Sequence, residues 1–161
     1  MIKAIVAVSL NGVFGNSKTN NLPWKNSYPE DMKFFRTQTA NSTIIFGRRT
    51  FESFGSRPLP KRRNMLISST QSTVGDVETF SSVQDAIKTT SDTVWLIGGL
   101  GIYQQSLILA DELYITSIPE IIEGSNELVY FPYVNPQMFN LSYSIPLFEK
   151  NNLIVSVYKR A

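Results

Sequence analysis

Short apolar segments that repeat along the chain constrain its fold more than any other feature. Residues 2–9, 43–47, 64–68, 93–97 and 112–118 are rich in Ile, Val, Leu and aromatic residues, and most carry apolar residues at consecutive positions. A strand that is buried on both faces has this pattern, because neither alternate set of side chains meets water. Such strands lie in the middle of a sheet that helices cover.

Helical segments separate several of these strands. We predict helices over residues 29–39, 48–54, 83–89 and 102–110. Pro29 and the acidic residues after it suit a first helical turn, and Ser81 or Ser82 can cap the third helix. Strand and helix therefore alternate through most of the chain, as they do when helices connect parallel strands.

The end of the chain follows a different pattern. Residues 139–148 and 152–158 alternate in polarity on either side of a turn at residues 149–151, which predicts an antiparallel hairpin. The whole pattern predicts one three-layer α/β domain over residues 1–161. Its central sheet would be mostly parallel, with the antiparallel C-terminal hairpin at the edge.

The residue types that are missing exclude several kinds of chemistry. The 161 residues contain no cysteine and no histidine, which excludes disulfides, thiolate nucleophiles, imidazole acid–base chemistry and Ser-His-Asp triads. We predict no metal site. The net charge of +2 does not indicate a nucleic-acid binder, and no apolar run approaches the roughly 20 residues of a membrane-spanning helix. Without an export signal or a membrane segment, we expect the chain in the cytoplasm.

Two predicted strands end in glycine immediately before a predicted helix. One is followed by Gly47-Arg48-Arg49-Thr50 and the other by Gly98-Gly99-Leu100-Gly101. Glycine lets an anion approach the backbone amides of a helix N-terminus, and arginine matches the geometry of phosphate. Each turn alone is more simply a tight connection or a solvated basic turn. Together, at the carboxyl ends of strands in one sheet, they indicate a dinucleotide with a pyrophosphate and an extra ribose phosphate.

An acidic residue lies on the apolar face of the predicted helix 29–39. Asp31 shares that face with Met32 and Phe35. A first-turn acid commonly points to water and stabilises the helix dipole, a role that Glu30 can fill. Asp31 could instead enter a pocket and bind a cationic or amidine-like ring edge, and the pattern leaves both interpretations open.

A basic loop over residues 57–63 contains two prolines. Most of its charges are expected in solvent. One arginine held by the proline-stiffened loop could receive a ligand carboxylate.

Several segments occur in a distinctive order and spacing. They are Ile5-Val6-Ala7-Val8, Asn11-Gly12-Val13-Phe14-Gly15, Leu22-Pro23-Trp24, Asp31-Met32-Lys33-Phe34-Phe35, residues 45–53, Arg57-Pro58-Leu59-Pro60, Arg62-Arg63-Asn64, Ile97-Gly98-Gly99, Ile102-Tyr103, Leu113-Tyr114-Ile115-Thr116 and Phe131-Pro132. Each alone is a weak signal. Together, over nearly all of the chain, they resemble the dihydrofolate reductase family.

The resemblance implies reduction of 7,8-dihydrofolate to tetrahydrofolate by NADPH, with antifolates such as methotrexate or trimethoprim as inhibitors. The catalytic residues that it implies are Asp31, which would grip the pterin, Thr116, which would bridge to Asp31, and Trp24. The loop that ends at Trp24 would close over the nicotinamide, where a water would protonate the substrate. Arg62 would bind the glutamate tail. The other implied substrate-binding residues are Ile5, Ala7, Met32, Phe35, Phe54, Leu59, Ile97 and Tyr103.

The resemblance also implies a cofactor site. Its residues would be Ala7, Phe14, Gly15, Gly47, Arg48, Arg49, Thr50, Ser68, Ser69, Gly98, Gly99, Leu100, Gly101 and Ile102. Arg48, Arg49 and the two serines would surround the adenosine 2′-phosphate. The Gly98–Gly99 turn, joined by a cis peptide in this family, would hold the pyrophosphate. We expect no nucleic-acid or membrane partner, and a monomer.

The chain departs from the family pattern at Leu100-Gly101, which replaces a small or polar pair, and at Ser125, where some members place an acid. One alternative is a reductase of the same fold that acts on a ribosylamino-pyrimidine, which would lack the Asp31–Phe35 helix pattern and Arg62. Another is a non-catalytic nucleotide-binding or structural protein. A dihydrofolate signal that methotrexate displaces would separate these functions.

Overall fold

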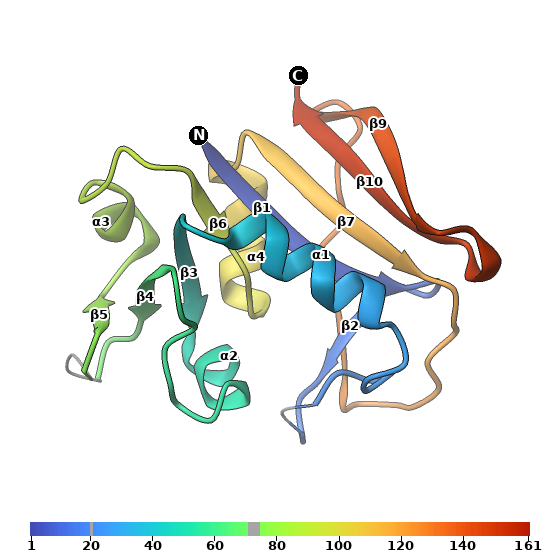
Figure 1. The fold of residues 1–161 in the computed structure, drawn as a ribbon, viewed down its shortest axis with the longest axis horizontal. Coiled ribbons are helices and arrows are strands. Elements are labelled where there is room, and N and C mark those ends of the chain that lie inside the picture. Colours follow the sequence, from blue (N-terminus) through green and yellow to red (C-terminus); the bar gives the residue numbers. More distant parts are fainter. Residues whose placement is uncertain (20, 71–74) are drawn as a thin grey trace.

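The computed structural model describes residues 1–19, 21–70 and 75–161 (Figure 1). The strands are β1 Ile2–Ser9, β2 Val13–Asn16, β3 Thr43–Gly47, β4 Arg63–Ile67, β5 Val77–Phe80, β6 Val94–Leu96, β7 Glu112–Ile118, β8 Leu128–Tyr130, β9 Phe139–Phe148 and β10 Leu153–Arg160. The helices are α1 Pro29–Thr39, α2 Arg48–Ser53, α3 Val83–Ile87 and α4 Leu100–Leu109, with a 3-10 turn at Glu149–Asn151. None of the described helices is long and apolar enough to cross a membrane.

Parallel pairing dominates the large sheet, whose eight strands run in the order β5-β4-β3-β6-β1-β7-β10-β9. All pairs from β5 to β7 are parallel. The last two pairs are antiparallel, because β10 returns along β7 and β9 forms a hairpin with β10. The predicted fold class, with a mostly parallel sheet and an antiparallel C-terminal edge, is confirmed.

The two faces of the sheet are covered by different helices, because successive residues of a strand point to opposite sides. In β3, Ile44 packs with aromatic residues of α1 and α2. The next residue, Ile45, packs with Val83 of α3 and Ile102 of α4. In Figure 1, α1 crosses in front of the sheet and α4 lies behind it. These are the three predicted layers.

Three short strands are missing from the sequence prediction. Strand β5 extends the large sheet beside β4, and β2 pairs with β8 in a separate small sheet. The β2 segment contains Gly15-Asn16, which reads as a turn, and β8 has only three residues. Boundaries also move by one or two residues, since β4 begins at Arg63 and α4 begins at Leu100.

One edge of the large sheet is β9, a strand of ten residues that contains Pro146. Its pairing with β10 is irregular, with register shifts between Leu153 and Ile154 and between Val157 and Tyr158. Such shifts are the signature of β-bulges, which bend and twist a strand.

Candidate active site

The two glycine turns predicted at the ends of strands lie against each other. The Gly47 N–H donates a hydrogen bond of 2.7 Å to the Gly98 carbonyl, and the Gly98–Gly99 peptide is cis. Gly98 has φ +118°, and a Cβ there would lie 3.2 Å from Thr50 Oγ1 and 3.3 Å from the Tyr103 ring. Both the backbone conformation and the lack of space therefore require glycine at this position.

Basic and hydroxyl side chains surround the first of these turns. Arg48 and Arg49 are exposed at the start of α2, where Arg48 forms an ion pair of 3.3 Å with Glu52. Ser68 and Ser69 follow β4 on the neighbouring strand. A cavity of about 270 Å³ opens here, lined by Arg48, Phe51, Glu52, Ser56 and Thr70. Positive charge beside an open cavity suits an anionic group.

The second turn continues directly into α4, whose first residues are Leu100, Gly101 and the buried Ile102. Strand β2 brings Phe14 to this helix, where its ring contacts Tyr103 edge to face with centroids 5.1 Å apart. Gly15 pairs with Val129 of β8. The small sheet thus holds the beginning of the loop that leads to Trp24 close to the glycine turns.

Asp31 lies in the first turn of α1 and is half-buried. Burial raises the pKa of its carboxyl above the usual range, and a hydrogen bond from the Thr116 hydroxyl of β7 lowers the pKa in part. The ion pairs among the described residues are Lys3–Glu112, Arg48–Glu52 and Arg63–Glu78, so no base there neutralises Asp31. Its carboxylate is therefore free to interact with a donor from outside the protein.

Most of the predicted apolar residues gather in the cluster beneath α1 and α2. Its members among them are Ile5, Phe35, Phe54, Leu59 and Ile97. Ala7 packs instead against the neighbouring cluster around Trp24, and Met32 is 37% exposed.

Tyr103 connects the middle of β1 with the residue that follows β6. Its hydroxyl contacts the carbonyls of Ile5 and Ile97, each at 2.9 Å. Burial and, to a smaller degree, the charge of Asp31 raise the pKa of Tyr103 above its usual range. This residue therefore lies between the Asp31 region and the Gly98 turn, and remains a neutral hydrogen-bond donor.

Arg62 is held by three neutral acceptors. Its guanidinium donates to Thr39 Oγ1 at 2.8 Å, to the Pro60 carbonyl at 2.6 Å and to the Arg36 carbonyl at 3.0 Å. Burial and then the nearby charge of Arg36 lower its pKa. The loop before it is braced by buried Asn64, whose amide exchanges hydrogen bonds with the Leu59 backbone.

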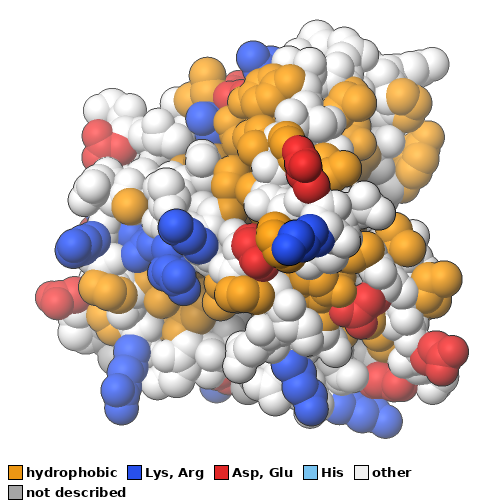
Figure 2. All heavy atoms as spheres, turned by 45° about the vertical axis from the view of Figure 1, so that its right-hand side comes forward, with side chains coloured by type: hydrophobic (Ala, Val, Ile, Leu, Met, Phe, Trp, Pro, Cys, Tyr) orange, Lys and Arg blue, Asp and Glu red, His pale blue; other side chains and the backbone are white. Residues whose placement is uncertain are grey.

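Lys and Arg side chains gather on the left half of the molecular face in Figure 2, while acidic side chains are more scattered. With a net charge of only +2, this grouping concentrates positive charge rather than reflecting a strongly basic chain. A local group of this kind favours an anionic ligand.

Two supporting residues have no role in the sequence analysis. Thr39 and Asn64 are buried and orient Arg62 and its loop. Asn64 belongs to the Arg62-Arg63-Asn64 segment that carries the family resemblance, whereas Thr39 has the sequence pattern of an ordinary helix end. Trp24, predicted at the end of a loop, is packed with Tyr28, Ile118 and Leu153.

Comparisons with known proteins agree with this geometry. The sequence model of the dihydrofolate reductase family matches residues 1–159. Dihydrofolate reductase of Haemophilus influenzae is 37% identical over 141 residues, which cover 86% of this chain and 83% of that protein. The enzyme of Bacillus subtilis is 36% identical over 138 residues, covering 84% and 79%. A solved structure of dihydrofolate reductase from Enterococcus faecalis, complexed with NADP(H) and RAB-propyl, has a TM-score of 0.85 at 30% identity and covers 99% of this chain and 96% of that one.

Proposed function

This chain belongs to the dihydrofolate reductase family and reduces 7,8-dihydrofolate to 5,6,7,8-tetrahydrofolate, and we propose that Asp31 holds the pterin ring for that reaction. One observation carries the proposal. The Asp31 carboxylate is half-buried, is neutralised by no base among the described residues, and accepts a hydrogen bond from Thr116. A carboxylate in this state binds a ligand edge that presents N–H donors.

Asp31 would orient the pterin by accepting hydrogen bonds from its amino and ring N–H groups. Thr116 would fix the rotamer of Asp31 and contact the same amino group. We assign the proton to a water that enters beside the loop ending at Trp24, because Asp31 would be occupied at the far edge of the ring. Burial raises the pKa of Asp31 because the pocket solvates the charged carboxylate less well than water does. Hydrogen-bond donors of the substrate must therefore offset the cost of burying that charge.

NADPH is the reductant and supplies the hydride when it is bound. The residues present fit this cofactor: the Gly98–Gly99 turn carries no side chain of its own, so an anion can approach its backbone, and the Thr50 hydroxyl lies beside it. Arg48 and Arg49 would hold the 2′-phosphate with Ser68 and Ser69. Amides at the start of α4, with Thr50, would hold the pyrophosphate, since a helix N-terminus favours an anion. The other residues of this site would be Ala7, Phe14, Gly15, Gly47 and Ile102.

We propose that Arg62 receives the carboxylate of the glutamate tail. Its partners are a hydroxyl and two carbonyls, which orient the guanidinium without cancelling its charge. Hydrogen bonds between a guanidinium and a carboxylate are among the strong ones. The apolar residues Leu59 and Phe35 would flank the segment between tail and ring.

Antifolates such as methotrexate or trimethoprim would bind in the same pocket, because their diamino rings present donors to Asp31. We also propose one domain over residues 1–161, and a cytoplasmic monomer. Sedimentation of the purified protein and fractionation of the cells that make it test the last two statements.

The deciding experiment follows NADPH oxidation with and without dihydrofolate, and then with methotrexate. Asp31→Asn should nearly abolish turnover at neutral pH while NADPH binding survives. Glu30→Gln is the matched control, since it removes a carboxylate from the same helical turn and should keep turnover. Full activity in Asp31→Asn would reject the role given to Asp31, and equal loss of turnover and NADPH binding would point to misfolding.

A further inference from the structure

The first turn of α1, which carries Asp31, has no side-chain cap. The residue at its N-cap position is Tyr28, with φ −128° and ψ 72°. The Tyr28 carbonyl accepts the N–H of Asp31 at 3.1 Å and that of Met32 at 3.4 Å. The backbone of Asp31 is thus hydrogen-bonded to the backbone of Tyr28. Contacts that hold Tyr28 in place therefore also position the start of the helix.

The Tyr28 side chain is anchored in the core. Tyr28 is 8% exposed and packs with Trp24, Ile118 and Leu153. Its hydroxyl donates a hydrogen bond to the carboxylate of Glu120. Burial, and then Glu120, raise the pKa of Tyr28 to about 12, so the hydroxyl remains a donor throughout the usual assay range.

Glu120 is itself tied to two strands. Its N–H donates to the Ile118 carbonyl at 2.8 Å, at the end of β7, and its carbonyl accepts the Leu10 N–H at 2.8 Å, just after β1. Strand β7 also carries Thr116, the hydrogen-bond partner of Asp31. The backbone of Glu120 is therefore held in place, and with it the carboxylate that accepts the hydrogen bond from Tyr28.

We propose that Tyr28 and Glu120 are positioning residues that hold the Asp31 carboxylate in register with Thr116. The two hydrogen bonds, Tyr28–Glu120 and Asp31–Thr116, connect the same two segments at separate points. One connection would let the first turn of α1 rotate about it, whereas two connections fix both its position and its direction. This inference rests on the role proposed for Asp31.

The effect on Asp31 should be visible in the pH dependence of the reaction. The groups that face Asp31 are Thr116 of β7 and Tyr103 of α4. Because the hydrogen bond from Thr116 lowers the Asp31 pKa, a looser helix start should move that pKa further upward. A residue that serves only packing would change stability without moving this profile.

The test uses Tyr28→Phe, which keeps the ring and removes the hydroxyl. We expect kcat/KM for dihydrofolate to fall about tenfold, the value of one good hydrogen bond to a charged group, with the midpoint of the pH profile shifted upward. The dissociation constant of NADPH should stay unchanged. Tyr133→Phe is the control, because Tyr133 is 78% exposed.

Glu120 supplies the second arm. Glu120→Gln keeps an oxygen that accepts from Tyr28 and should remain within about twofold of the parent, whereas Glu120→Ala should resemble Tyr28→Phe. The double variant Tyr28→Phe with Glu120→Ala should lose little more than either single variant, because both remove one interaction.

The inference is overturned if Tyr28→Phe and Glu120→Ala keep the parental pH profile and kcat/KM, even when their melting temperatures drop. It is equally overturned if Glu120→Gln loses as much as Glu120→Ala. Asp31→Asn, measured beside them, separates the two proposals. If that variant is inactive while Tyr28→Phe behaves as the parent, only the positioning role fails.

Discussion

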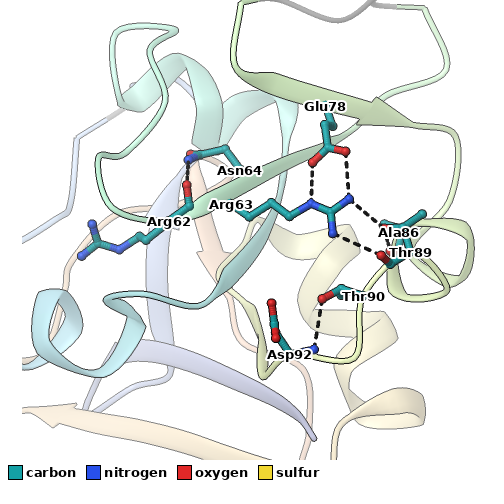
Figure 3. A network of polar contacts seen from close by, with 8 residues as sticks. All are labelled: Arg62, Arg63, Asn64, Glu78, Ala86, Thr89, Thr90 and Asp92. Atoms are coloured by element: carbon teal, nitrogen blue, oxygen red, sulfur yellow. Dashed lines mark hydrogen bonds and ion pairs between the residues drawn. The ribbon is translucent and has the colours of Figure 1, made fainter.

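Arg62 and Arg63 are neighbours in the chain, yet their side chains point in opposite directions and meet different surroundings (Figure 3). Arg63 forms two hydrogen bonds with the Glu78 carboxylate, at 2.6 and 2.9 Å, and Glu78 raises its pKa. Among the residues that the structure describes, Arg62 donates only to a hydroxyl and two carbonyls, and burial lowers its pKa. One charge is cancelled within the protein and the other is merely oriented.

The carboxylates show the same contrast. Glu78 is paired with Arg63, and this hydrogen bond is the main reason that its pKa is lowered. Asp31 has Thr116 as its partner, and burial raises its pKa. Charges that are oriented but not cancelled are costly to the folded protein, and a ligand of opposite character relieves that cost. Asp31 and Arg62 are therefore the groups expected to meet the substrate.

The largest difference is expected when each carboxylate is replaced by its amide. Asp31→Asn should lower kcat/KM for dihydrofolate by about 10³-fold, because the pterin loses a charged acceptor where the reaction needs it. Glu78→Gln should remain within about twofold of the parent, since its carboxylate is paired with Arg63 and lies outside the proposed substrate site. Steady-state NADPH oxidation measures both, and similar losses in the two variants would contradict the contrast.

The two arginines should differ next. Arg62→Leu should weaken folate and methotrexate by about 10- to 100-fold and spare ligands without the glutamate tail, because one guanidinium–carboxylate contact is lost. Arg63→Leu should leave both classes of ligand unchanged. Calorimetric titration with methotrexate and trimethoprim gives the values, and uniform weakening by Arg62→Leu would argue against a tail-binding role.

Arg48 and Arg49 test whether exposed arginines also serve a ligand. Their joint replacement by leucine should lower the preference for NADPH over NADH about tenfold, because the two cofactors differ only in the 2′-phosphate. The ratio of the two kcat/KM values measures this preference. An unchanged ratio would reject the phosphate assignment.

The smallest effects concern stability, and they have opposite signs. The folded-state pKa of Asp31 is raised, so the folded protein binds the extra proton and stability falls as pH rises through the window above the unfolded value near 3.8. The folded-state pKa of Glu78 is lowered from 4.5, so its pairing stabilises above that value and is lost as pH falls below it.

At neutral pH, Asp31→Asn should therefore raise stability by about 1 kcal/mol, or about 3 °C in melting temperature. Glu78→Gln should lower stability by about 0.5 kcal/mol, since this pair is substantially exposed to solvent and screened. Thermal unfolding from pH 4 to pH 8 measures both curves. Curves that run parallel to the parent would show that neither carboxylate contributes as described.

Local patterns predict much of the fold. The apolar runs place β1, β3, β6 and β7 correctly, because a strand buried on both faces requires apolar residues at nearly every position. The strand–glycine–helix turns are also predicted from the sequence, since the positive φ of Gly98 is a local backbone conformation that favours glycine. Strands β2 and β8 could not be predicted, because three or four residues with a glycine carry no periodic signal.

In the candidate site too, local sequence patterns reveal some residues, whereas contacts between distant segments are not predicted. Asp31 and Arg62 stand out because charge beside apolar residues or prolines is unusual, and the family resemblance adds their roles. The contact between Tyr28 and Glu120 spans 92 positions and follows from how α1 docks on β7, which no local pattern encodes. The role of Thr39 is not predicted for the same reason, because the hydrogen bond that it accepts from Arg62 links a helix end to a distant loop.

The irregular strand β9 bears on the behaviour of the protein at high concentration. An exposed sheet edge offers unpaired backbone groups to another copy, and Leu141 and Tyr143 add apolar surface beside it. Pro146 has no backbone N–H, and the two register shifts break the even spacing of the strand. Replacing Pro146 by a β-branched residue would remove one of these two disruptions, and we expect such a variant to aggregate more readily at high concentration.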